Sequence, residues 1–261
     1  MEFAGGGLFV QIEGAIGWLT INQPARLNAM RLDMWQALPA AMGFLERDPI
    51  VRCIIVRGAG ERAFVSGADI AEFDEVRFDA ASNDAFVRTV SAASASIVET
   101  PKPVIAMIRG YCIGGGMVIA SACDLRFCSA GSRFGVPAAK LGIGYELDNY
   151  RRLLDLVGPG RALEMLLTAR QFGDAEAFAA GFVNGVVSPD ELEQRVRDCA
   201  AMMAGNAPRS LAAAKLANRA GLDRRLDADA QAAIDACFDS ADFAEGRTAF
   251  REKRRAIFKG V

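Results

Sequence analysis

The stretch Ile105-Ala-Met-Ile-Arg-Gly-Tyr-Cys-Ile-Gly-Gly-Gly-Met-Val-Ile-Ala-Ser-Ala-Cys-Asp124 guides our interpretation of the whole chain. An apolar run typical of a buried strand ends at Gly110, and glycines 114 to 116 then begin an apolar helix of small residues. Glycine lets a backbone approach a ligand closely, and the first N–H groups of a helix have no partner within it. The turn therefore suits either a tight packing corner or an oxygen that becomes negative during a reaction.

Strands and helices alternate on both sides of this stretch. The expected strands cover residues 8–13, 16–21, 51–57, 104–108, 125–130 and 132–134, and the expected helices cover 29–46, capped by Asn28, and 83–99. From residue 148 the pattern is helical over 149–157, 160–168, 174–181, 189–204, 207–221, 226–240 and 242–258, with one strand-like run at 180–187. The sequence predicts an α/β core with crossovers over residues 1–195 and a C-terminal helical region over 196–261.

Composition narrows the function classes. The chain has 261 residues, of which 52% are hydrophobic and 24% charged, so it can bury a large core. Its net charge of −2 predicts no nucleic-acid partner and no anionic membrane surface. The absence of histidine excludes histidine triads and histidine-bound zinc, and the six cysteines lack metal-ligand spacing, so we expect no metal site.

The same features indicate a compartment. No uninterrupted apolar run reaches a membrane-spanning length, and residues 1–7 lack the pattern of a signal peptide. The cysteines lie in apolar surroundings, as free buried thiols do in a reducing environment. We therefore expect a cytoplasmic protein.

Several segments, in order and at consistent spacing, resemble the crotonase (enoyl-CoA hydratase/isomerase) superfamily. They are Pro24–Met30, Phe64–Ile70, Pro101–Gly116, Cys123–Leu125, Phe134–Gly135, Leu141–Gly142, Ala179–Asn184 and Glu245–Lys253. The resemblance covers nearly the whole chain. It implies a spiral of strand-strand-helix turns, and C-terminal helices that pack between subunits into a homotrimer or hexamer. It also implies an acyl-CoA thioester substrate, with coenzyme A as part of that substrate and no tightly bound cofactor.

The resemblance also implies particular site residues. By position, the backbone N–H groups of Ala68 and Gly115 form an oxyanion hole for the thioester carbonyl, which is the arrangement that stabilises an enolate without side chains. The positions that match coenzyme A contacts are Arg26, Leu27, Ala29, Ser66, Asp69 and Ile70, with Phe250 and Lys253 reaching a neighbouring subunit's nucleotide. The alternative for Phe250 and Lys253 is an amphipathic helix with a solvated charge. The alternative for Asp69 is a turn residue whose carboxylate binds local amides.

The chain departs from the family at the acid–base positions. Val118 and Ala138 stand where hydratases carry two glutamates, and neither side chain can transfer a proton. General acid–base catalysis contributes roughly 10²- to 10⁴-fold to such a reaction. We therefore expect decarboxylation or isomerisation rather than efficient hydration.

Tyr145 and Glu146 follow Leu141-Gly142 and are the candidate replacements. Tyr145 coincides with a tyrosine of the methylmalonyl-CoA decarboxylase branch, where it would orient a carboxylate or deliver a proton. Glu146 is either a relocated acid–base group, as in an isomerase, or, together with Asp148, a favourable charge at the start of a helix. Two further alternatives stay open, namely a hydratase with non-standard acid–base groups and a non-catalytic acyl-CoA binder.

Overall fold

In the computed structural model, which describes residues 1–69, 72 and 79–261, the core is built on two sheets. The larger sheet has seven strands, in the order β1 (Glu2–Phe3), β2 (Leu8–Glu13), β3 (Ile16–Ile21), β4 (Cys53–Gly58), β6 (Val104–Ile108), β8 (Leu125–Ser129) and β11 (Gly185–Val187). The first three strands are antiparallel, and pairing is parallel from β3 onward. All five residues of β6 are buried, as expected for a central strand covered on both faces.

A smaller sheet stands beside the first. Its order is β10 (Phe172–Gly173), β9 (Arg133–Gly135), β7 (Tyr111–Ile113) and β5 (Ala63–Val65), and only β10 runs antiparallel to its neighbour. Each of β4, β6 and β8 is followed by a short strand of this sheet, and β7 then leads into helix α4 (Gly115–Ala122). The chain thus turns repeatedly through strand, strand and helix, and the predicted α/β architecture is confirmed.

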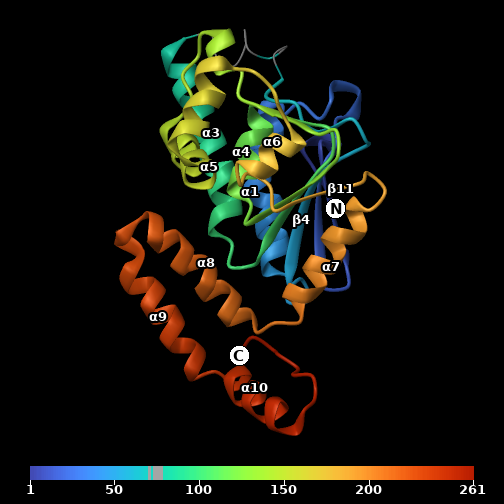
Figure 1. Ribbon diagram of the computed structural model, residues 1–261, viewed down its shortest axis with the longest axis vertical. Helices are drawn as coiled ribbons and strands as arrows, with labels where there is room; N and C mark the ends of the chain where they lie inside the picture. The colour runs from blue at the N-terminus through green and yellow to red at the C-terminus, as the bar shows by residue number, and fades with distance from the viewer. Residues whose placement is uncertain (70–71, 73–78) are drawn as a thin grey trace.

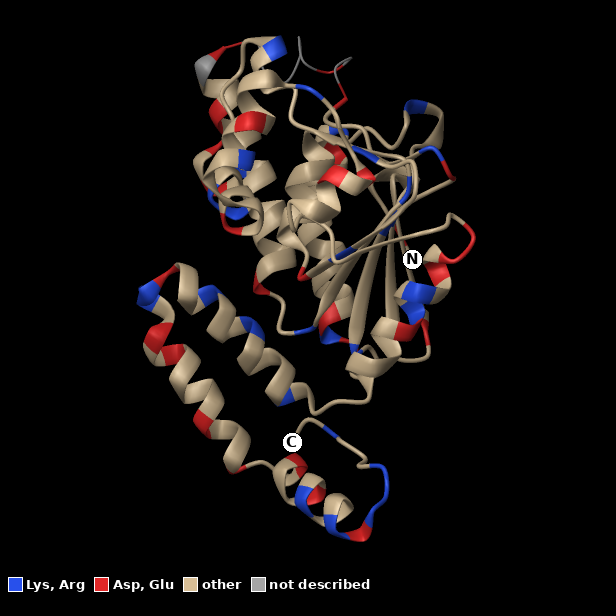
Figure 2. Cartoon of the chain, viewed as in Figure 1, with Lys and Arg blue, Asp and Glu red and all other residues tan. Residues whose placement is uncertain are grey.

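Helices cover both faces of the larger sheet (Figure 1). The core contains α1 (Leu32–Arg47), α3 (Ala80–Glu99), α4, α5 (Leu147–Thr168), α6 (Asp174–Ala179) and α7 (Leu192–Ala204), with 3-10 turns at Ala4–Gly6, Pro24–Arg26 and Ala138–Leu141. Alternate residues of β4 face opposite ways, because Ile54 and Val56 pack with α1 while Ile55 packs with Leu192 and Val196 of α7. Most of the larger sheet is tan in Figure 2, and the charges lie largely on helices and connecting loops.

The last three helices leave the core as an arm (Figure 1). The arm comprises α8 (Pro208–Leu222), the 3-10 turn Arg224–Leu226, α9 (Asp227–Phe238) and α10 (Ala241–Glu252). Lys215 of α8 ties it to the core, because its Nζ lies 2.8 Å from Oδ2 of Asp124 and donates to the carbonyl of Lys102 at 2.9 Å. The domain boundary expected at residue 195 falls inside α7, whose residues Val196 and Ala200 are buried against the sheet.

Two local expectations were wrong and one was confirmed. Asn28 does not cap a helix: it adopts φ +56°, and its buried amide donates to the carbonyls of Ala59 and Ala63, so α1 begins only at Leu32. The two helices expected at 149–157 and 160–168 are confirmed as the two halves of α5, which are separated at Gly158, where the backbone is not helical and φ is +74°. The helix expected over 242–258 ends at Glu252, because Lys253 is left-handed and the chain turns back until the carbonyl of Val261 accepts from the N–H of Ala241.

Candidate active site

The backbone N–H of Ala68 lies in a turn that the neighbouring chain holds on both sides. Met30 N–H donates to the carbonyl of Gly67 at 2.8 Å, and Asp69 N–H donates to the carbonyl of Met30 at 2.9 Å. These two bonds flank Ala68, which forms a parallel bridge with Met30. Within the described part of the chain, the Ala68 N–H donates to no acceptor. The turn therefore presents a fixed amide that is free to bind a ligand.

The N–H of Gly115 is presented by the glycine turn that opens α4. Gly114 takes φ +53° and ψ −106°, a conformation that favours glycine, and its own N–H is held by the carbonyl of Gly135 at 2.9 Å. A Cβ on Gly115 would lie 2.9 Å from Cζ2 of Trp35 and 3.5 Å from the nitrogen of Ala68. The contact with Trp35 is too close for an added Cβ, so the packing at this point favours glycine at position 115.

The N–H of Gly115 also donates to no acceptor among the described residues. It is the first residue of α4, whose earliest N–H groups have no acceptor inside the helix. The next residue, Gly116, packs so closely that a Cβ there would lie 2.3 Å from the carbonyl oxygen of Val65. The structure thus brings two unpaired backbone donors, from turns 47 residues apart, to one place.

A cavity of about 160 Å³ opens in front of these two amides. Its walls come from the Ser66–Ala68 turn, the start of α4, α3 and the segment that leads into α5. Val118 and Ala138 belong to the wall and are 6% and 9% exposed, so the two positions expected to lack carboxylates face the cavity as apolar surface. Tyr145 and Glu146 also line it.

Tyr145 is buried at its polar end. Its hydroxyl oxygen is closed to solvent and has no hydrogen-bond partner among the described residues. Burial raises the pKa of this phenol well above its usual value, while the nearby charge of Arg152 acts in the opposite direction and is outweighed. Tyr145 is therefore a neutral hydroxyl that can donate a hydrogen bond or a proton, and it cannot serve as a base near neutral pH.

Glu146 has the opposite character, because it is exposed at the edge of the cavity. It is the residue before the first turn of α5, yet its carboxylate makes no capping hydrogen bond. Asp148, two residues on, is exposed and pairs with Arg151 at 3.1 Å. This geometry fits the helix-start interpretation for Asp148, whereas Glu146 stays available to the cavity.

The residues expected to contact coenzyme A lie mostly around the Ala68 turn. Ser66 N–H donates to the carbonyl of Leu27 at 3.1 Å, and Nη1 of Arg26 lies 2.7 Å from Oδ2 of the buried Asp69. Ala29, also nearby, is 8% exposed and sits in the same bend of the chain. The carboxylate of Asp69 thus orders the Arg26 side chain beside the cavity. Ile70 lies outside the described residues.

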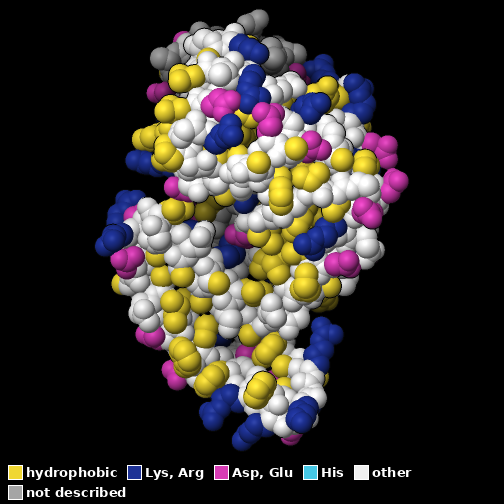
Figure 3. All heavy atoms as spheres, in the orientation of Figure 1, with side chains coloured by type: hydrophobic (Ala, Val, Ile, Leu, Met, Phe, Trp, Pro, Cys, Tyr) yellow, Lys and Arg dark blue, Asp and Glu magenta, His cyan; other side chains and the backbone are white. Residues whose placement is uncertain are grey.

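Phe250 and Lys253 lie elsewhere, at the end of α10 in the arm (Figure 1). Phe250 is 86% exposed and is absent from the cavity wall, and so is Lys253. Phe250 is one of several exposed apolar side chains of the arm, together with Phe238 and Phe243. Figure 3 shows hydrophobic side chains on the surface of the arm. Within a single chain, the two residues are not brought to the site.

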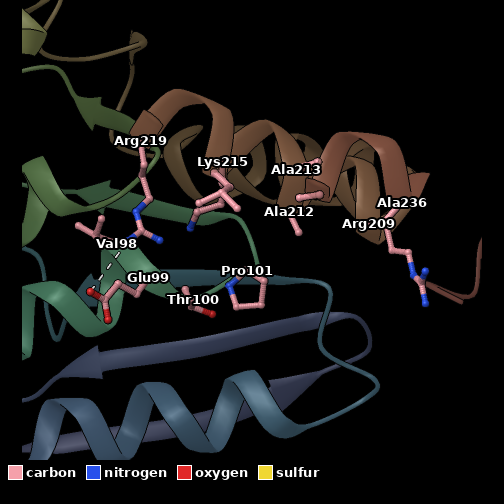
Figure 4. Close-up of a pocket in the computed structure, with 12 residues that line it drawn as sticks. Val98, Glu99, Thr100, Pro101, Arg209, Ala212, Ala213, Lys215, Arg219 and Ala236 are labelled. Carbon is pink, nitrogen blue, oxygen red and sulfur yellow. Dashed lines mark ion pairs between the residues drawn. The ribbon is translucent and has the colours of Figure 1, made fainter. Parts of the chain in front are cut away.

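Two larger cavities lie between the arm and the core. Neither is lined by Ala68 or Gly115. One, of about 330 Å³, lies between the end of α3 and the α8–α9 hairpin, where Arg219 and Glu99 approach within 4.0 Å (Figure 4). The other, of about 750 Å³, is lined by charged groups that include the Asp124–Lys215 pair. The smaller cavity is the better candidate site, because the N–H groups of Ala68 and Gly115, from two separate turns, meet there beside the titratable side chains of Tyr145 and Glu146.

Sequence reasoning missed Asn149 and Trp35, which both line the cavity. Asn149 is 6% exposed and sits four residues after Tyr145, a spacing that could have placed the two on one side of the chain. Trp35 is 1% exposed and has no sequence signal that separates it from an ordinary core residue. In the described part of the chain there is no cluster of cysteine and carboxylate groups suited to a metal ion, and no helix long and apolar enough to cross a membrane.

Comparison with known proteins agrees with this architecture. The model of the enoyl-CoA hydratase/isomerase family matches residues 11–261. The chain is 36% identical to the short-chain-enoyl-CoA hydratase of Clostridium acetobutylicum over 95% of both chains. It is 35% identical to the peroxisomal Delta(3,5)-Delta(2,4)-dienoyl-CoA isomerase of Arabidopsis thaliana over 78% of this chain and 77% of that one.

A solved structure from Hyphomonas neptunium, described as a putative enoyl-CoA hydratase/isomerase family protein, superposes with a TM-score of 0.91 at 34% identity. The superposition covers 97% of each chain. The fold of turns through strand, strand and helix with C-terminal helices is therefore the crotonase fold. Sequence and structure together show that this chain belongs to the enoyl-CoA hydratase/isomerase family, the crotonase superfamily of acyl-CoA enzymes.

Proposed function

We propose that the chain binds an acyl-CoA thioester with its carbonyl oxygen between the N–H groups of Ala68 and Gly115. The observation that carries this proposal is the pair of fixed, unpaired amides at the mouth of one cavity. When a proton or a carboxyl group leaves the α-side of the thioester, negative charge collects on that oxygen. Two aimed donors stabilise it, and losing one such donor costs on the order of 3 kcal/mol of barrier.

The proposed coenzyme A path runs past the turn that holds Arg26 and Asp69. Their ion pair of 2.7 Å fixes the bend beside Ser66, where backbone groups can bind the pantetheine and adenine. Phe250 and Lys253 are proposed to reach the nucleotide of a neighbouring subunit in a homotrimer or hexamer. The exposed phenylalanines of the arm support such an interface, since isolated apolar surface of this kind is costly in water. The proposed compartment is the cytoplasm.

For the reaction itself, we propose a double-bond shift in an enoyl-CoA with Glu146 as the proton carrier. Among the described residues of the cavity wall, Glu146 is the carboxylate. One carboxylate is enough to take a proton from one carbon and return it to another, whereas hydration must also position a water molecule. The name of the Arabidopsis relative supports isomerisation. The name of the Clostridium relative supports hydration, in which Glu146 would act on an ordered water.

Decarboxylation is a second candidate, favoured by the apolar side chains of Val118 and Ala138. The bond between the α-carbon and the carboxyl carbon would break, its electron pair would pass to the thioester oxygen, and carbon dioxide would leave. The enolate would then take a proton, for which the neutral Tyr145 hydroxyl is a suitable donor. No base is needed. The names of the relatives favour an enoyl-CoA reaction over this one.

Three substrates tested side by side distinguish these reactions: a 3-enoyl-CoA, crotonyl-CoA and methylmalonyl-CoA. We expect conversion of the 3-enoyl-CoA to be fastest, and Glu146→Gln to slow it by about 100-fold. Asp148→Asn is the matched control, because Asp148 is equally close in sequence but pairs with Arg151 on the surface.

Each other outcome has a defined meaning. Fast hydration of crotonyl-CoA that is lost in Glu146→Gln would replace isomerisation with hydration. Release of carbon dioxide from methylmalonyl-CoA that survives Glu146→Gln would favour the second candidate. Tight binding of all three thioesters without any turnover would show a binding protein and would sink the enzymatic proposal.

A further inference from the structure

Asn149 is a polar group in an otherwise largely apolar part of the cavity wall, and the mechanism above gives it no task. It lies in the first turn of α5, lines the cavity with Val118 and Ala138, and is 6% exposed. Asparagine in such a place is unfavourable unless its amide is fully hydrogen-bonded. The possible role of Asn149 therefore depends on the hydrogen-bond partners of its amide oxygen and of its amide nitrogen.

The oxygen end of the Asn149 amide is occupied. Nη1 of Arg152 donates to its Oδ1 at 3.2 Å and to Oγ of the buried Ser94 at 3.2 Å. A guanidinium group carries donors only, so it must face the amide oxygen and cannot face the NH₂ group. Arg152 lines the cleft between core and arm rather than the cavity, and thus holds Asn149 from behind.

The nitrogen end is unoccupied. Within the described part of the chain, Nδ2 of Asn149 donates to no acceptor, and unlike the closed hydroxyl of Tyr145 this nitrogen is open to the solvent of the cavity. The cavity wall thus holds a side-chain donor without a protein acceptor, with the Arg152 guanidinium behind it. Because an occupant of the cavity displaces water from this donor, an occupant that supplies an acceptor oxygen is favoured over one that does not.

We propose that Asn149 is a specificity-determining residue that selects acyl-CoA thioesters carrying an acceptor oxygen on the acyl chain, in addition to the thioester oxygen. Its Nδ2 donates to that oxygen, and Arg152 is the positioning residue that fixes which end of the amide faces the cavity. The inference rests on the proposed binding of an acyl-CoA thioester in this cavity and narrows the class of acyl group. A ketone and a carboxylate both supply the required acceptor.

The test compares dissociation constants of three thioesters by titration calorimetry. Butyryl-CoA has no oxygen on its acyl chain beyond the thioester, acetoacetyl-CoA adds a ketone, and succinyl-CoA adds a carboxylate. We expect at least one oxygenated thioester to bind the wild-type protein about tenfold more tightly than butyryl-CoA, which is the effect of one hydrogen bond. The thioester that gains most identifies the source of the acceptor.

Substitutions then assign the effect. Asn149→Leu keeps the volume of the side chain and removes the donor, so we expect the preference, measured as the ratio of the dissociation constants for the oxygenated thioester and butyryl-CoA, to vanish. Asn149→Asp, which keeps an oxygen for Arg152 and removes both N–H donors, gives a second measurement if the leucine variant unfolds. It should likewise lose the preference for the ketone.

Arg152 is tested by the ratio of the two dissociation constants, which a general loss of stability would not change. Arg152→Met should reduce the preference several-fold because the amide can then turn over, and Arg152→Lys, which keeps a donor, should restore part of it. Arg151→Met is the matched control, since the exposed Arg151 pairs with Asp148 and does not contact Asn149.

The inference is overturned if the Asn149 variants keep the wild-type ratio, or if the wild-type protein binds all three thioesters equally. A different result marks failure of the proposed function itself. If butyryl-CoA does not bind the wild-type protein and neither oxygenated thioester does, the cavity is not an acyl-CoA site, and the role given to Asn149 fails with it.

Discussion

The two sides of the cavity are built from different parts of the polypeptide. On one side, Ala68 and Gly115 present backbone N–H groups whose positions are set by turns and by the sheet. On the other side, Val118, Ala138 and Tyr145 contribute side chains. A single substitution can replace a side chain of the cavity without changing the fold. The backbone N–H groups change position only if a substitution distorts the backbone.

This difference explains how one fold can serve several reactions. In the proposed function, the N–H groups of Ala68 and Gly115 would stabilise charge on a thioester oxygen whatever bond has been broken, and would serve a hydratase, an isomerase or a decarboxylase alike. The side chains opposite would then decide which proton moves. Membership of the family is shown by the matches in sequence and structure, and the reaction must be argued from the side chains.

The largest effect is expected from adding a methyl group at Gly115, on the side of the cavity formed by backbone N–H groups. In Gly115→Ala the new Cβ would lie 2.9 Å from Cζ2 of the buried Trp35, so the Trp35 ring or the glycine turn has to shift. We expect kcat/KM to fall on the order of 100- to 1,000-fold on any thioester that the wild-type protein converts. Gly160→Ala, where a Cβ meets open space, is the control and should keep full activity. Equal activity in both variants would remove the special role of Gly115.

A second prediction concerns the opposite side of the cavity, where carboxylates can be introduced at Val118 and Ala138. Val118→Glu combined with Ala138→Glu places two acids in a cavity whose backbone donors are intact. We expect crotonyl-CoA hydration to rise by about 100-fold or more, since acid–base groups contribute that much in such reactions. Initial rates of hydration, measured beside thermal unfolding to check that the buried acids are tolerated, decide this. No gain in a folded double variant would mean that the backbone N–H groups are not positioned for hydration.

A smaller effect is expected at Tyr145, where activity and stability should change in opposite directions. Tyr145→Phe removes a buried hydroxyl that has no protein partner, so the free energy of unfolding should rise by about 1 kcal/mol. Turnover should fall by about tenfold, because the bound substrate loses one donor. Chemical denaturation and steady-state kinetics give the two values. A loss of stability would reveal a partner for the hydroxyl in the folded protein.

The smallest effect concerns alkaline pH. Burial raises the pKa of Tyr145 in the folded protein above its unfolded value of about 10. The folded state then keeps a proton that the unfolded state releases, so the stability from this group is complete below about pH 10 and is lost as the pH rises toward the folded value. Unfolding curves between about pH 9 and 11 should show a steeper loss for the wild-type protein than for Tyr145→Phe. Parallel curves would contradict the burial of the phenol.

The glycine turn and several core strands could be predicted from the sequence, for a physical reason. Glycine turns such as 114–116 have few structural alternatives, and the strand runs 8–13, 16–21 and 104–108 appear in the structure with the predicted bounds. The absence of carboxylates at Val118 and Ala138 could be noticed only through the resemblance to the family, which implies where the glutamates of hydratases stand. Asn149 was missed because its role depends on Arg152, which donates both to the Asn149 amide and to Ser94, and the contact with Ser94 of α3 arises only in the folded chain.

The arm shows a second limit of prediction from sequence. Its helices were predicted, but the end of α10 at Glu252 depends on a left-handed Lys253 and on contacts made by the returning chain. Lys259 and Gly260 donate their N–H groups to the carboxylate of Asp242, a pairing between residues 17 and 18 positions apart. Helical periodicity describes each segment by itself. It does not indicate where the chain after a helix folds back against that helix.

The most direct test of the central claim measures charge on the thioester oxygen without requiring a reaction. Acetoacetyl-CoA forms an enolate that absorbs in the ultraviolet, and its titration can be followed free and bound to excess protein. If the N–H groups of Ala68 and Gly115 bind that oxygen, the apparent pKa of the ligand should fall by at least about one unit on the wild-type protein and not on Gly115→Ala, because one unit corresponds to about 1.4 kcal/mol of preference for the charged form. A bound ligand that titrates like the free one on the wild-type protein would contradict the account.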